Sequence, residues 1–398
     1  MSNVVSLPPA DWTKSLQRYS TGAPHGSLAN ACAMLRGSPK LQDIVAFDVF
    51  AVRTILVGPP PWDVEPNFFR PRPWEAHDDL LLTEHIQRED IPVKTATVAQ
   101  AVEVVAHESS FHPVLDYLDG LKWDGKPRLD DWISKYLGAV DTPYTADVGR
   151  AALVGAVARI RNPGCKLDTV PIIEGAQGAG KSSAARVLFD PWFSDDLADL
   201  GTKDASMQTQ GAWLIEISEL DAMTRQEVSR VKAFVSRSTD RFRPPYGSRI
   251  IESPRSCVFW GTTNSDAYLK DETGGRRFWP IKAGRIDLAG LELVRDQLWA
   301  EASKLLAAGA VWWLVNPETN RIAEGEQIAR YQGDPWDEVI AAHLKTVNDV
   351  SVDEILRNVL HIEIGRANQV DQNRVARCLR AHGMLRFQVR TGDKRTWR

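Results

Sequence analysis

Residues 175–182 read Gly-Ala-Gln-Gly-Ala-Gly-Lys-Ser and complete the pattern G-x-x-x-x-G-K-[ST]. Apolar residues 170–173 precede this stretch, and residues 183–188 have the composition of a helix start. A strand, a glycine turn and a helix N-terminus form the context in which backbone N–H groups close around phosphate oxygens. The stretch therefore predicts an α/β fold that binds and hydrolyses a nucleoside triphosphate.

Each position of this glycine-rich loop has an expected role. The nucleotide-binding set comprises Gly175, Ala176, Gln177, Gly178, Ala179, Gly180, Lys181, Ser182 and Ser183. Lys181 is expected to reach the β- and γ-phosphates, and the Ser182 hydroxyl is expected to ligate Mg²⁺. ATP and Mg²⁺ are the cofactors that this pattern predicts.

The composition is that of a globular protein of two or three domains. Of the 398 residues, 43% are hydrophobic and 25% are charged, and no apolar run has membrane-spanning length. The first residues lack the basic and apolar regions of a signal peptide, so a cytoplasmic location and no membrane partner are expected. Cys32, Cys165, Cys257 and Cys378 form no C-x-x-C pair, so neither a zinc site nor a disulfide framework is predicted.

A second motif supplies the acids that hydrolysis requires. Residues 213–220 form an apolar strand that carries Glu216 and Glu219, 35 and 38 residues after Lys181. One acid is needed to hold Mg²⁺ and another to orient the attacking water. Glu216 is assigned to the metal, and both glutamates are assigned to catalysis. The alternative is that Glu219 lies on a solvated turn.

Two further motifs fit the same reaction. Residues 256–264 form an apolar strand that ends in Asn264, whose amide offers a donor and an acceptor to the γ-phosphate or the water. Arg276 and Arg277 follow a glycine pair and suit an arginine finger, which stabilises the charge of the transferring phosphate. The alternative is that these arginines form surface ion pairs with neighbouring acids.

A basic segment between these motifs predicts a nucleic-acid partner. Residues 232–249 carry five basic side chains, one acid and a Pro-Pro-Tyr-Gly turn. Basic and aromatic residues on an exposed hairpin can follow a phosphate backbone and stack on bases. The DNA contacts expected here are Lys232, Arg241, Arg243, Tyr246 and Arg249. A solvated basic face is the alternative.

The C-terminus predicts a second DNA contact. Residues 366–398 carry nine basic residues and two acids, a net charge of +7, whereas the remaining chain carries −11 of the total −4. Two helices are expected, from residue 352 and over 373–382, followed by a hairpin over 386–398. This order describes a winged helix with Arg374, Arg377 and Arg380 on one helix face and Lys394 and Arg395 in the wing. A cap that does not touch DNA is the alternative.

The order of the motifs is similar to that of a known family. Several stretches, taken in order, resemble the virulence-associated protein E family. They are residues 112–118, 121–125, 174–182 and 216–220, Asp240 with Arg243, and residues 246–247, 261–264 and 271–277. That family belongs with the AAA+-type superfamily 3 helicases of phages and mobile elements. The resemblance covers roughly residues 75–315. It implies a DNA-dependent ATPase in mobile-element replication that assembles as a homo-oligomer, with a hexameric ring expected.

The motifs divide the chain into four predicted segments. These are a mostly helical region over 1–112, an ATPase domain over 113–315, a connector over 316–345 and a basic winged-helix-like module over 346–398. The long amphipathic helix expected over 291–308 ends the ATPase domain.

Three functions remain open from the sequence. The first is an oligomeric motor that unwinds single-stranded or forked DNA. The second is an initiator or regulator that loads on DNA with ATP and does not unwind it. The third is an NTPase that acts on protein or RNA in a defence system. A basic segment and a basic tail favour the first two.

Overall fold

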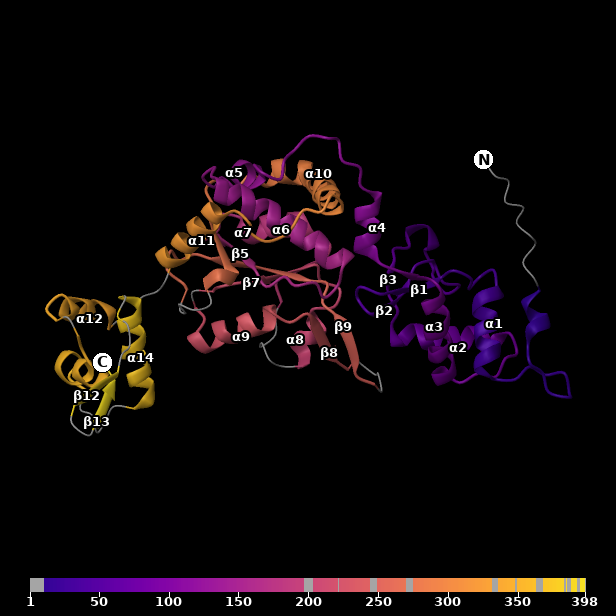
Figure 1. Cartoon of the computed structure of the whole chain (residues 1–398). Coiled ribbons are helices and arrows are strands. Elements are labelled where there is room, and N and C mark those ends of the chain that lie inside the picture. Colours follow the sequence, from indigo (N-terminus) through magenta and orange to yellow (C-terminus); the bar gives the residue numbers. More distant parts are fainter. Residues whose placement is uncertain are drawn as a thin grey trace.

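The computed structural model describes residues 11–196, 203–220, 222–243, 249–269, 275–330, 336–347, 349–362, 368–382, 384, 388–391 and 394–397. Figure 1 shows three units along the chain, with the first and third on opposite sides of a central unit. Within the described residues, no helix combines the length and the apolar character needed to span a bilayer.

The first unit is a mixed α/β domain, so the prediction of a mostly helical region over 1–112 is only partly right. Its elements are η1 (Trp12–Ser15), α1 (Leu28–Gly37), β1 (Val45–Asp48), β2 (Arg53–Leu56), η2 (Pro66–Phe68), β3 (Arg72–Pro73), α2 (Ala76–Arg88), α3 (Thr95–Glu108) and β4 (Ser110–Phe111). The strands form one sheet in the order β3-β2-β1-β4. One core joins helices α1, α2 and α3 to strands β1 and β2. Against that core pack Trp62 and Trp74, which belong to the proline-rich stretch 59–74.

The central unit contains a five-stranded sheet. Its helices and strands are α4 (Pro113–Gly120), α5 (Trp132–Leu137), α6 (Pro143–Arg161), β5 (Val170–Glu174), α7 (Lys181–Phe189), β6 (Phe193–Ser194), α8 (Lys203–Gln208), β7 (Leu214–Ile217), α9 (Arg225–Val235), β8 (Thr239–Phe242), β9 (Ile251–Pro254), β10 (Val258–Thr263), η3 (Gly275–Arg277), β11 (Phe278–Lys282), α10 (Leu288–Ala307) and α11 (Pro317–Ala329). The sheet order is β11-β5-β10-β7-β6, and all four neighbouring pairs are parallel. The alternation of strands and helices expected over 170–281 is therefore present.

Helices cover both faces of this sheet, as a parallel sheet requires. Along β5, Val170 and Ile172 pack with α9, whereas Ile173 packs with the layer of α6, α7 and α10. The layer of α6, α7 and α10 packs around a cluster of aromatic rings, in which the Trp213 and Trp299 ring centroids lie 4.3 Å apart. Each of these two indoles donates a 2.9 Å hydrogen bond to a helix carbonyl, so its polar atom is satisfied within the core.

The predicted connector over 316–345 is divided between two units. Helix α11 packs on α6 and β11 and buries Thr319 and Ala323, so it belongs to the central unit. Helix α12 (Asp337–Leu344) shares a separate core with α13 (Val352–Glu354), the π-helical η4 (Ile355–Val359) and α14 (Gln369–Ala381). The antiparallel pair β12 (Gln388–Thr391) and β13 (Lys394–Trp397) follows, so the predicted order of helices and hairpin is present.

Candidate functional site

The glycine-rich loop joins the carboxyl end of β5 to the first turn of α7. Gly178 and Gly180 have φ values of +77° and +90°, in the left-handed region that favours glycine. Gly180 is the N-cap of α7 and supplies no side-chain cap. The first N–H groups of a helix have no acceptor within the helix. The loop and the start of α7 therefore form the concave donor surface that an anion binds.

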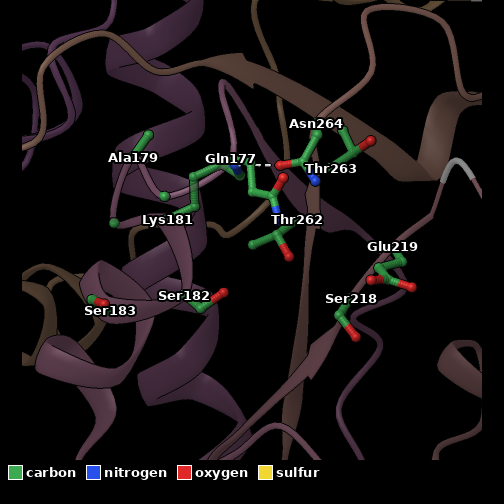
Figure 2. Close-up of a pocket in the computed structure, with 12 residues that line it drawn as sticks. Gln177, Ala179, Lys181, Ser182, Ser183, Ser218, Glu219, Thr262, Thr263 and Asn264 are labelled. Atoms are coloured by element: carbon green, nitrogen blue, oxygen red, sulfur yellow. Dashed lines mark hydrogen bonds between the residues drawn. The ribbon is translucent and has the colours of Figure 1, made fainter.

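Lys181 is the first residue of α7, at the end of this loop. Its side chain is buried, and Nζ donates 2.8 Å hydrogen bonds to the Gly175 carbonyl, the Ala176 carbonyl and Asn264 Oδ1. Figure 2 shows the side chain directed across the pocket toward Asn264. Two predicted site residues, 83 positions apart in the sequence, are thus in direct contact.

Glu216 lies between the loop and the neighbouring strand. Its Oε1 accepts 2.6 Å hydrogen bonds from Ser182 Oγ and Thr262 Oγ1. A buried carboxylate beside a hydroxyl is a donor set that Mg²⁺ accepts when phosphate oxygens and water complete the shell. Among the described residues, no group of three or more His, Cys, Asp or Glu side chains could hold a metal ion alone. The residues present therefore fit a magnesium ion that arrives with a phosphate ligand.

A cavity of about 350 Å³ opens over these groups. It is lined by residues 177–183 of the loop, by Ser218 and Glu219, and by Thr262, Thr263 and Asn264. Glu219 is exposed and has a φ of +53°, which is uncommon for a residue with a Cβ. Figure 2 places Ser218 and Glu219 across the pocket from Lys181 and Ser182. The backbone geometry therefore presents the Glu219 carboxylate to the side of the cavity opposite the loop.

The two adjacent arginines lie outside this cavity. They end η3, immediately before β11. Arg277 Nε donates to Ser236 Oγ at 3.1 Å and lies 3.4 Å from Asp168 Oδ2, whereas Arg276 is exposed. Arg277 thus makes contacts within its own chain, and Arg276 faces solvent.

The predicted basic hairpin is present as β8 and β9, and it points away from the helices above the sheet (Figure 1). Arg241, Arg243 and Arg249 are exposed, and Arg241 Nε lies 3.1 Å from Glu252 Oε1 on the opposite strand. Tyr246 lies outside the described residues. Lys232 is 7% exposed and its Nζ lies 5.6 Å from the Phe278 ring centroid, so its burial contradicts the predicted DNA contact. The helical spacing that buries α9 against the sheet includes this position.

The C-terminal arginines lie on α14. The Arg374 guanidinium stacks 3.8 Å above the Trp336 ring centroid, a cation–π contact between α14 and the start of α12. Arg377 and Arg380 belong to the same helix, and Lys394 and Arg395 belong to β13, but their side chains lie outside the described residues.

A buried ion pair adjoins the start of the loop. Glu174, the last residue of β5, accepts hydrogen bonds from Arg330 Nε and, at 2.8 Å, from Arg330 Nη2. The Tyr268 hydroxyl donates to Glu174 Oε1 at 2.7 Å. Burial and the charge of Glu174 raise the pKa of Tyr268. Burial opposes the Arg330 charge, but hydrogen bonding to Glu174 outweighs it and raises the Arg330 pKa.

Sequence reasoning assigned no role to Thr262, Thr263 or Ser218, although all three line the cavity. Thr262 also donates to Glu216, which makes it part of the site. The available signal was its position at the carboxyl end of a buried strand, where ligands of parallel sheets bind.

The fold and the site define a mixed α/β protein whose parallel sheet presents a glycine-rich loop, Glu219 and Asn264 to one cavity, with Glu216 buried behind Ser182 and Thr262. The chain belongs to the virulence-associated protein E-like family, whose domain model matches residues 118–332, more than half of the chain. This confirms the family expected from the motif order.

Comparison with curated proteins finds no match. Among solved structures, the apo structure of the NrS-1 C-terminal region is 12% identical, with a TM-score of 0.45, and the match covers 89% of this chain and 94% of that one. The A form apo structure of the same region is also 12% identical with a TM-score of 0.45, and covers 89% and 95%.

Proposed function

We propose that this protein is a Mg²⁺-dependent ATP hydrolase that works on DNA, with the central unit as an AAA+-like P-loop domain of the superfamily 3 type. One observation carries the proposal. Lys181 of the glycine-rich loop contacts Asn264 across the cavity, while Ser182 of the same loop contacts Glu216. Three motifs from three adjacent strands thus meet where a nucleotide phosphate chain would bind.

The loop residues would hold the phosphates. The backbone N–H groups at the start of α7 and the Lys181 ammonium supply positive potential for the β- and γ-phosphates. Ser182 and Glu216 would hold Mg²⁺, which neutralises developing phosphate charge when bound. Thr262 keeps the Glu216 carboxylate oriented toward Ser182.

Two further groups would act on the attacking water. Glu219 would accept a hydrogen bond from the water and orient it, a role supported by its position in the cavity lining opposite the loop. Asn264 would contact the γ-phosphate or the water, and its hydrogen bond to Lys181 would change when the nucleotide binds. Arg276 is the better placed finger, because Arg277 is paired within its own chain. An arginine outside its own cavity would serve a neighbouring subunit, which requires a homo-oligomer such as a hexamer.

DNA would bind at two basic features. The hairpin of β8 and β9 exposes Arg241, Arg243 and Arg249, which suit a phosphate backbone. The C-terminal unit has the helix, helix and hairpin order of a winged helix, with α14 as the recognition helix. Its net charge of +7 over residues 366–398 supports a DNA contact.

The decisive experiment measures steady-state ATP hydrolysis with and without single-stranded DNA across a salt series. Lys181→Ala should abolish turnover, because it removes the ammonium that meets the phosphates. Lys304→Ala is the matched control, because Lys304 is exposed on α10 and does not line the cavity. DNA should raise the wild-type rate, and rising salt should remove the stimulation as phosphate contacts weaken.

Turnover that DNA leaves unchanged would overturn the DNA-directed part and favour an NTPase that acts on protein or RNA. A strand-displacement assay then separates the remaining two functions. DNA-stimulated turnover with strand displacement supports a helicase, whereas stimulation without displacement supports an initiator or regulator.

A further inference from the structure

Arg330 lies outside the cavity and contacts two segments that adjoin it. Its guanidinium holds Glu174, the residue before the glycine-rich loop. Its carbonyl accepts hydrogen bonds from the N–H groups of Tyr268 and Leu269 at 3.1 and 3.0 Å. These two residues follow Asn264 by four and five positions. One residue at the end of α11 therefore fixes the entry to the loop and the segment that follows the asparagine strand.

The connection from Glu174 to the site is short. The next residue, Gly175, donates its N–H to the Thr263 carbonyl at 3.3 Å and accepts from Lys181 Nζ at 2.8 Å. A shift of the Glu174 side chain would be transmitted through one peptide to the lysine acceptor. Because a misplacement of about 1 Å can change a rate by about a hundredfold, holding Glu174 in place matters for a reaction in this cavity.

Burial makes this ion pair rigid. The Glu174 side chain is 2% exposed and the Arg330 side chain is 11% exposed. The Tyr268 hydroxyl is a third hydrogen-bond donor to Glu174. Glu326, one turn earlier on α11, also pairs with Arg330. A buried carboxylate with three donors is confined to one geometry, since any other position would leave a charge unpaired.

The same residue lies at the exit toward the C-terminal unit. Five residues separate Arg330 from Trp336, which stacks on Arg374 of α14.

We propose that Arg330 is a positioning residue for the nucleotide site, which sets the geometry of the glycine-rich loop through Glu174 and Tyr268. This inference rests on the proposed function, because it names how the ATP site is positioned.

The experiment compares four full-length variants in the rate of ATP turnover, the KM for ATP and thermal unfolding. Tyr268→Phe removes one hydrogen bond to Glu174 and keeps the ring. Arg330→Met leaves the buried Glu174 charge without its cation and with only the Tyr268 hydroxyl as donor, and the double variant Glu174→Gln with Arg330→Met removes both charges. Glu326→Gln is the control, because it changes the other partner of Arg330 and leaves the link to β5 intact.

Stability and positioning should separate in the double variant. Arg330→Met should lower the melting temperature, and the double variant should recover most of that loss, because no buried charge is left unpaired. The KM for ATP should stay about tenfold above wild type in both, since neither holds the loop entry. Tyr268→Phe should show a smaller rise in KM. Glu326→Gln should keep the wild-type KM.

The inference would be overturned if both the KM for ATP and the melting temperature of the double variant returned to their wild-type values. The ion pair would then have a structural role only. If wild type hydrolyses ATP and the Arg330 and Tyr268 variants match it, the inference alone fails. If wild type and Lys181→Ala are equally inactive in turnover and in binding of a fluorescent ATP analogue, the proposed function fails and this inference fails with it.

Discussion

Thr262→Val tests whether Glu216 is the acid that holds the metal. The substitution keeps the shape of a side chain that is 6% exposed and removes the hydroxyl that donates to Glu216 Oε1 at 2.6 Å. A hydrogen bond to a charged group contributes about 1.5–3 kcal/mol to stability, so the folding equilibrium should fall by about tenfold to a hundredfold. Ser182 would remain as the second donor to Glu216.

The functional effect should be seen in the metal requirement. Loss of a group that orients a metal ligand typically lowers metal affinity by about 10–100-fold. The Mg²⁺ concentration for half-maximal ATP turnover should therefore rise by about that factor. The assay is a Mg²⁺ titration at saturating ATP, with stability measured separately by urea unfolding.

Thr319→Val is the matched control for this experiment. Thr319 is also fully buried and donates to a carboxylate, Asp147 Oδ2, at 2.7 Å, but it lies on α11 and does not line the cavity. Its replacement should lower stability and leave the Mg²⁺ titration unchanged. The reasoning would be refuted if Thr262→Val shifted the titration no more than Thr319→Val did.

Four other substitutions test the fold and the assigned roles. Gly261→Ala in β10 should destabilise the central unit by about 1–3 kcal/mol in urea unfolding, because its Cβ would lie 2.5 Å from side-chain methyl groups on both sides; unchanged stability would contradict the packing. Arg277→Ala should lower the melting temperature, because it removes an ion pair within the chain. Arg276→Ala should leave the melting temperature unchanged and reduce ATP turnover in the assembled protein only. The reverse pattern would exchange the roles of the two arginines. Burial lowers the pKa of His112 from its ordinary value of 6.5, so the unfolded chain binds the proton more readily and stability should fall as the pH drops below about 6.5. His112→Asn, which can still cap α4, should show a weaker fall in melting temperature between about pH 7 and pH 5, and an equal fall would exclude this histidine as the cause.

The site was largely predictable from sequence because its parts are local motifs. The glycine-rich loop, Glu216 and Asn264 each stand at the end of a strongly apolar strand, and such strands are recognised by their composition. Their proximity follows from a parallel sheet, whose carboxyl ends share one edge. The contacts of Thr262 and Arg330 were not predictable, because a hydroxyl or a guanidinium gives no signal of its partner in a distant segment.

The errors concern weak patterns. Strands β3 and β4 contain two residues each, which is too short for an alternating pattern, so the first sheet was not predicted. Helix α11 was interpreted as part of a connector because the residues it buries, Thr319 and Ala323, are small or polar. Lys232 has the charge of a DNA contact, but its position on α9 buries it against the Phe278 ring. The charge of a residue does not by itself indicate whether its side chain is buried.

The aromatic cluster beneath the site has an optical consequence. Trp213 and Trp299 lie close enough for their electronic transitions to couple, and the Phe189 ring touches both edge-on. Trp299 is also anchored to the Leu188 carbonyl of α7, the helix that begins at the glycine-rich loop. Fixed aromatic packing of this kind gives a near-ultraviolet circular dichroism signal. A tilt of α7 on nucleotide binding would change the angle between the two indoles, so this signal would report on the proposed nucleotide site without a label.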